Sequence, residues 1–179
     1  SRVPLINHIH EGLAVMREIG ASDFAQRAFC LHPLYQADAD LTKHHLRSLP
    51  GVPIQVILLV MEYRNQANAW LSDKVWLANF NDGGPLLVQK NGTPTPGPLP
   101  EVRDMLVADK VQNYKDFRTY HLGTHPRSKE LELYFETWLK VLGIDGLEFA
   151  RLSGVIAAMR CFVASKLGDE VEIPKELLS

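Results

Sequence analysis

The polar residues most able to form a reactive or binding site in this chain lie in the stretch EYRNQANAWLSDK, which covers residues 62–74. It follows an unbroken apolar run, VILLVM at residues 56–61, which predicts a buried helix. Arg64 and Asn68 are four residues apart, and Asn65 and Asn68 are three apart, so each pair shares a face of that helix. Because a buried arginine needs a partner, the stretch is either the solvated end of a helix that leaves the core or the polar floor of a pocket.

Residues 63–73 (YRNQANAWLSD) resemble the second motif of the HD-domain phosphohydrolases, a family of helical metal enzymes. In an ungapped alignment, Arg64 stands at the metal-binding histidine of that motif, Asn65 at its aspartate and Asn68 at the glutamate that follows. The remaining matches are Trp70, Leu71 and Asp73. The resemblance implies an all-α fold and, in intact members, a divalent metal that polarises a phosphate and activates a water.

Two further landmarks of the family have counterparts in the chain. His32 stands where the first metal-ligating histidine would be, near the start of a helix, and Asp109 in the pair Ala108–Asp109 stands for the last metal-ligating aspartate. The matched residues span 32–109 and resemble the deoxynucleotidase-like and phage-type members most, which implies a phage or bacterial setting.

The departures from the family pattern argue against a metal. Arginine stays protonated and cannot be a metal ligand, and asparagine is a weaker ligand than aspartate. Only His32 and Asp109 remain as weak metal candidates, so no cofactor is expected. We expect Arg64 to occupy the vacated metal position and to pair with Asp109, or with Glu62 nearer the surface. Because arginine binds phosphate bidentately, a nucleotide or phosphoester could still bind, and the pocket candidates are His32, Glu62, Arg64, Asn65, Asn68 and Asp109.

Two other interpretations stay open. In one, the chain is an active but divergent metal-dependent phosphohydrolase, whose metal site is rebuilt from His32, Glu62, Asp73 and Asp109. In the other, it is a helical interaction module without a ligand pocket, which contacts partners through residues 91–100 and the tail from Glu170. The sequence assigns no catalytic residue and leaves enzymatic activity undecided.

Other polar clusters are weaker candidates. His121 and His125 have the spacing of a helical metal pair, but Gly123 lies between them, so we expect a loop without a metal. His8 and His10 are two residues apart and would face different sides of a helix, so no site is expected there. The sequence contains no GxxxxGK, GxGxxG or GxSxG motif, which argues against P-loop, Rossmann and α/β-hydrolase chemistry.

The composition is that of a globular domain, and we expect a single domain over residues 1–179. Hydrophobic residues make up 46% of the chain and the net charge is −2, so no basic surface for nucleic acid or membranes is predicted. Cys30 and Cys161 lack metal-type spacing, which favours reduced thiols and a cytoplasmic location. The apolar residues 147–163 include Arg151 and Arg160, which favours a core helix over a membrane span. The oligomeric state is left open.

Helical spacing dominates the chain and predicts an all-α bundle of six or seven helices. The expected helices cover approximately residues 4–19, 22–32, 33–41, 53–71, 100–120, 128–142 and 147–166. Residues 79–100 predict a long exposed loop rich in proline and glycine, within which residues 86–89 could pair as a short strand. The tail at 168–179 is expected to be loosely attached.

Overall fold

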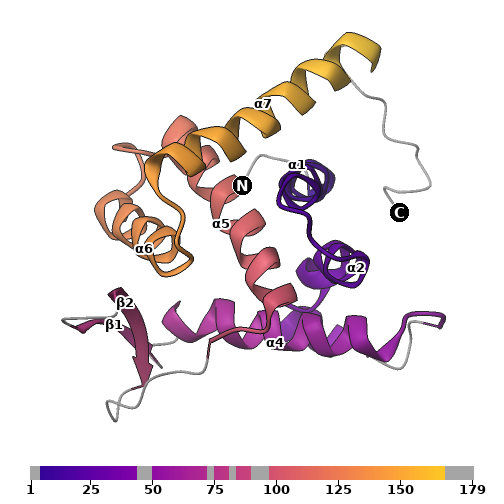
Figure 1. Ribbon diagram of the computed structural model, residues 1–179, viewed down its shortest axis with the longest axis horizontal. Coiled ribbons are helices and arrows are strands. Elements are labelled where there is room, and N and C mark those ends of the chain that lie inside the picture. The colour runs from indigo at the N-terminus through magenta and orange to yellow at the C-terminus, as the bar shows by residue number, and fades with distance from the viewer. Residues whose placement is uncertain (1–4, 44–49, 72–74, 81–83, 90–96, 168–179) are drawn as a thin grey trace.

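The structure, a computed structural model, describes residues 5–43, 50–71, 75–80, 84–89 and 97–167. Within these residues the predicted all-α bundle is confirmed, with seven α-helices, one short 3-10 helix and one two-stranded hairpin (Figure 1). The elements are α1 (Leu5–Glu18), α2 (Asp23–Leu31), η1 (His32–Leu34), α3 (Asp38–Lys43), α4 (Ile54–Leu71), β1 (Val75–Phe80), β2 (Gly84–Gln89), α5 (Pro100–Tyr120), α6 (Ser128–Val141) and α7 (Gly146–Leu167). No helix in the described part of the chain is long and apolar enough to cross a membrane.

Helix α5 is the centre of the bundle. It packs against α1, α2, α4, α6 and α7, and Figure 1 shows it running between α1 and α2 on one side and α6 on the other. Pro100 occupies its first turn, where a missing N–H costs no hydrogen bond. Residues 105–112 are buried without interruption, which is the pattern of a helix surrounded by others. The polar residues Asp109, Lys110 and Gln112 are therefore held in the interior of the bundle.

Helices α1 and α2 approach each other closely at Gly12. A Cβ atom at this position would lie only 2.1 Å from Cζ of Phe29, which is fully buried on α2. Glycine is therefore needed for this packing. Ser22 begins α2 by accepting a hydrogen bond from the Ala25 backbone N–H, as expected of an N-cap. The close approach of Phe29 to Gly12 places the C-terminal end of α2, and with it His32, against α1.

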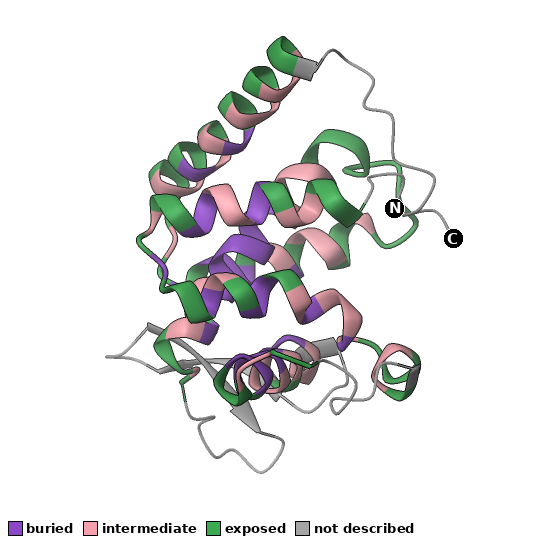
Figure 2. Ribbon diagram, turned by 90° about the vertical axis from the view of Figure 1, so that its right-hand side faces the viewer, coloured by how far each residue is buried: buried purple, intermediate pink, exposed green. Residues whose placement is uncertain are grey.

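The apolar residues of the first turn of α1 do not belong to its buried face. Leu5 is 54% exposed, and the fully buried positions of α1 are Glu11, Gly12, Val15 and Met16. Figure 2 shows that buried positions gather in the middle of the bundle, whereas much of the far half of α7 is exposed. The face of α1 that meets α5 thus carries polar residues as well as apolar ones.

Two expectations about the fold were wrong in detail. The helix predicted from Pro33 is divided into η1 and α3, because Pro33 lies in a 3-10 turn that closes with the Tyr35 N–H donating to the His32 carbonyl. The loop predicted for residues 79–100 instead contributes to a hairpin in which β1 pairs antiparallel with β2, from Val75 opposite Gln89 to Phe80 opposite Gly84. Residues 86–89 do pair as a strand. The loop residues 81–83 and 90–96 and the tail at 168–179 lie outside the described residues.

Candidate metal site

Three side chains with metal-ligating atoms meet where α1, η1 and α5 come together. His8 on α1, His32 in η1 and Asp109 on α5 each offer one ligand atom, and these atoms all lie within 4.8 Å of one another. The Nε2 atom of His8 is 3.2 Å from Nε2 of His32 and 3.6 Å from Oδ1 of Asp109. His32 and Asp109 are buried, whereas the His8 side chain is 15% exposed, so the cluster reaches solvent on the His8 side.

The ring of His32 is fixed by a backbone hydrogen bond. Its Nδ1 lies 2.6 Å from the carbonyl oxygen of Phe29. Because a carbonyl can only accept, Nδ1 carries the proton and Nε2 presents a lone pair to the cluster. Burial lowers the pKa of His32 to about 4, so the imidazole is neutral near pH 7. The ring centroids of Phe29 and Tyr63 lie 4.6 and 4.8 Å away and hold the imidazole between them.

The ring of His8 is oriented in the same way by Gln112. Nδ1 of His8 lies 2.7 Å from Oε1 of Gln112. The amide nitrogen of Gln112 donates to two carboxylates, at 2.7 Å to Asp116 and 3.3 Å to Glu11. This identifies Oε1 as the atom that faces His8, so the Nδ1–H of His8 donates to it. Nε2 of His8 then also presents a lone pair toward His32 and Asp109.

Asp109 is an ionised carboxylate with both oxygens bound. Lys110 donates to Oδ2 at 2.7 Å and Asn113 donates to Oδ1 at 2.8 Å. Burial acts to raise the pKa of Asp109, but Lys110, His8 and His32 outweigh it and hold this pKa well below its usual value. The ammonium group of Lys110 is itself buried, at 5.5 Å from the centroids of the Tyr134 and Trp138 rings.

Two Nε2 lone pairs that face each other at 3.2 Å repel unless a positive charge lies between them. A divalent metal or a proton on one ring would supply that charge. With metal–nitrogen bonds of about 2.0–2.1 Å, neighbouring ligand atoms of a tetrahedral site lie about 3.3 Å apart. The separations of 3.2 and 3.6 Å are close to this value. Two imidazoles and one carboxylate also form a ligand set that suits divalent transition metals.

The residues of the predicted polar pocket are only partly brought together. Of the six candidates, His32 and Asp109 meet in the cluster. The predicted pairing of Arg64 with Asp109 or Glu62 is wrong, because Arg64 forms an ion pair with Asp38. The preceding residue, Tyr63, packs its ring against His32, so Arg64 lies about 100° further around the helix, on the side of α3.

The remaining candidates on α4 do not join the cluster of His8, His32 and Asp109. Glu62 accepts a hydrogen bond from Gln66 at 2.8 Å, and the side chain of Asn68 donates to the Gln36 carbonyl at 3.0 Å. Asn65 is exposed. Asp73, which one interpretation included as a ligand, lies outside the described residues.

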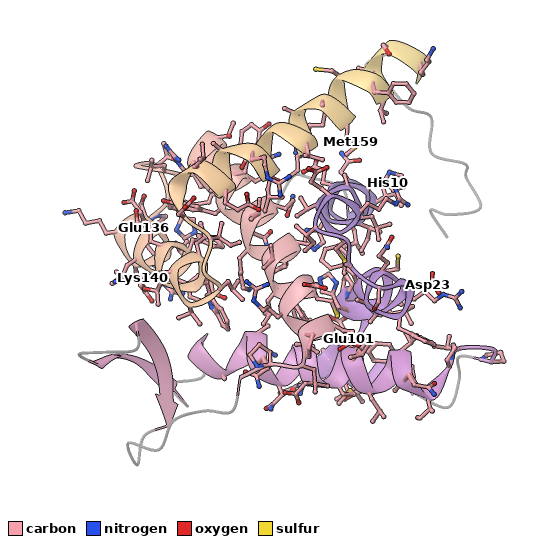
Figure 3. The ribbon with its side chains drawn as sticks, in the orientation of Figure 1. His10, Asp23, Glu101, Glu136, Lys140 and Met159 are labelled. Atoms are coloured by element: carbon pink, nitrogen blue, oxygen red, sulfur yellow. The ribbon has the colours of Figure 1, made fainter. Side chains whose placement is uncertain are left out.

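His8 was not expected to take part in any site. Considered only with His10, it lacks a partner of useful spacing, and His10 indeed lies on the outer side of α1 (Figure 3). A usable signal was present in the positions of His8, Glu11 and Val15, which recur at three- and four-residue intervals and follow the face of α1 that packs on α5. His121 and His125 lie in the turn after α5, as predicted.

Comparison with known proteins supplies no relative for this chain, since no protein-family model, curated protein or solved structure matches it. The HD-domain resemblance therefore stays a prediction. A functional proposal therefore has to rest on the arrangement of His8, His32 and Asp109 and on the hydrogen-bond partners that orient their side chains.

Proposed function

We propose that this chain binds one divalent metal ion through Nε2 of His8, Nε2 of His32 and Oδ1 of Asp109, and uses it to act on phosphoesters. The observation that carries the proposal is the 3.2 Å separation of two imidazole Nε2 atoms whose Nδ1–H groups are both committed to oxygen acceptors. That arrangement places two lone pairs and one carboxylate oxygen within 4.8 Å of one another, which is a donor set that suits a metal.

The partners of the three ligands support a metal over a shared proton. Metal-binding histidines usually donate their other N–H to a carbonyl or carboxylate, and ligating carboxylates are themselves hydrogen-bonded. Phe29, Gln112 and Lys110 supply these partners here.

A phosphoester substrate is supported by the resemblance and by charge. His32 and Asp109 are the residues that correspond to the first and last metal ligands of the HD-domain phosphohydrolases, and they lie in one cluster. Arg64 and Asn65 replace the central histidine and aspartate of that family, and His8 supplies an imidazole from another helix. A divalent ion and Lys110 together outweigh the charge of Asp109, which favours an anionic substrate at the open metal position.

Metal binding is tested by calorimetric titration of chelator-treated protein with Zn²⁺ and, separately, with Mn²⁺. We expect one ion per chain, and a loss of binding in His8→Gln, His32→Gln and Asp109→Asn. His10→Gln is the matched control, because it alters an exposed histidine on the same helix. Titrations in which the wild type binds no ion, or in which His8→Gln binds as the wild type does, would contradict the proposed site.

The substrate class is tested separately, with phosphomonoesters, phosphodiesters and nucleotides in the presence of the metal that binds. We expect release of phosphate or nucleoside that stops on chelation and is lost in His8→Gln. A protein that binds metal at these residues but hydrolyses none of the three classes would remove the phosphoester part of the proposal and leave the metal site standing.

A further inference from the structure

A buried polar network continues from His8 to α7. Its first member is Gln112, which is 2% exposed and accepts the Nδ1–H of His8 at 2.7 Å. The amide nitrogen of Gln112 is held by the carboxylates of Glu11 and Asp116, at 3.3 and 2.7 Å. The two carboxylates therefore decide which end of the amide faces His8.

Arg160 of α7 binds both of these carboxylates. Its Nε lies 2.5 Å from Oε1 of Glu11, and its Nη2 lies 3.2 Å from Oδ1 of Asp116. Glu11 is only 1% exposed, so its charge needs such a partner. Lys115 adds a second cation, 3.3 Å from Glu11 and 3.0 Å from Asp116, and the four charges balance. A guanidinium can bridge two carboxylates in a fixed geometry, which an ammonium group cannot do as well.

The position of Arg160 on α7 makes this contact dependent on how the helix docks. Helix α7 packs on α1 and α5, and its side chains Leu152 and Ile156 are fully buried. Arg160 follows one turn later, and the next two residues, Cys161 and Phe162, are exposed. Figure 1 shows the C-terminal part of α7 continuing beyond the body of the bundle. Arg160 is thus placed near the limit of the docked part of α7.

We infer that docking of α7 through Arg160 regulates the metal affinity of the site by fixing the tautomer of His8. The inference rests on the proposed metal site. Without Arg160, the carboxylates of Glu11 and Asp116 lose the guanidinium that fixes their positions, and the Gln112 amide that they hold moves with them, away from Nδ1 of His8. The proton of His8 is then no longer held on Nδ1, and a metal would have to displace it from Nε2, which weakens binding. Arg160 and Gln112 are positioning residues in this scheme.

The test compares Gln112→Leu and Arg160→Met with Arg151→Met. The last is the matched control, since it removes an arginine of the same helix whose ion pairs are with Glu18 and Glu148 at the surface. The first readout is the imidazole Nδ1–H signal of His8 in the proton NMR spectrum of the metal-free protein. The Nδ1–H signal of His32, which is bonded to the Phe29 carbonyl, serves as the internal reference for folding.

We expect the His8 signal to disappear in Gln112→Leu and Arg160→Met and to persist in Arg151→Met, while the His32 signal persists in all three. The second readout is the Kd for Zn²⁺. It should rise about 10–100-fold in Gln112→Leu, the usual cost of losing such a partner, and by a smaller factor in Arg160→Met. Arg160→Lys keeps the charge but loses the bridge, and should lie between Arg160→Met and the wild type.

Two outcomes separate this inference from the proposed function. A His8 signal that persists in Arg160→Met, with the Kd for Zn²⁺ unchanged, would overturn the link to α7 while the metal site stands. If the wild type binds no metal, the proposed function fails, and regulation of metal affinity fails with it. Loss of both histidine signals in Arg160→Met would mean that Arg160 is needed for folding, which also overturns a specific effect on His8.

Discussion

Replacing Lys110 by methionine should strongly destabilise the metal-free protein. The side chains of Lys110 and Asp109 are each 4% exposed, and their Nζ and Oδ2 atoms are 2.7 Å apart. Methionine keeps much of the length and the contact with the Tyr134 and Trp138 rings, so the main loss is electrostatic. Removal of one partner of a buried ion pair costs about 3–5 kcal/mol, because the other charge is left uncompensated.

We expect a loss near the lower end of that range, because Asn113 still donates to Asp109. The assay is urea denaturation in the presence of a chelator. Saturating Zn²⁺ should then reduce the difference in the free energy of unfolding between Lys110→Met and the wild type. The metal binds only the folded state and supplies a positive charge that Lys110 no longer provides.

The double variant Asp109→Asn with Lys110→Met is the control for this reasoning. Replacing both charges removes the uncompensated carboxylate, so the double variant should be more stable than Lys110→Met alone. The reasoning is refuted if Lys110→Met costs less than about 1 kcal/mol, or if the double variant is as unstable as the single one.

Three further predictions concern packing and charge. Gly12→Ala should lower the free energy of unfolding by about 1–3 kcal/mol and weaken metal binding, because its Cβ would meet the buried Phe29 ring. A variant as stable in urea as the wild type would contradict this. In metal-free protein, the free energy of unfolding should fall as the pH is lowered from about 6.5 to about 4, since the unfolded chain protonates His32 in this window and the folded protein does not. His32→Gln should flatten that part of the pH profile. Asp38→Ala should cost less than about 1 kcal/mol by thermal denaturation, because the Asp38 partner of Arg64 is 96% exposed.

The helices were predictable because their limits depend on local chemistry. Pro100 and Ser128 mark the first residues of α5 and α6, and Ser22 caps α2, as their residue types indicate. The hairpin was predicted only in part. Residues 86–89 were expected only to be able to pair as a short strand within a loop, and no partner strand was predicted at residues 75–80.

The candidate site was half predictable. His32 and Asp109 were selected through a family resemblance, and their meeting depends on α2 and α5 lying side by side. His8 could not be paired with them from spacing, because ligands on three separate elements share no sequence interval. The partner of Arg64 was misjudged for a related reason, since the roll of α4 is set by the packing of Tyr63 against His32.

The central claim is that His8, His32 and Asp109 hold one metal ion. Anomalous diffraction from crystals grown with Zn²⁺, recorded on both sides of the zinc absorption edge, tests it most directly. The account predicts a single strong peak within about 2.0–2.2 Å of Nε2 of His8, Nε2 of His32 and Oδ1 of Asp109, and no peak at this place in His8→Gln. A map without a peak between these three atoms, or with its strongest peak at another group of side chains, would contradict it.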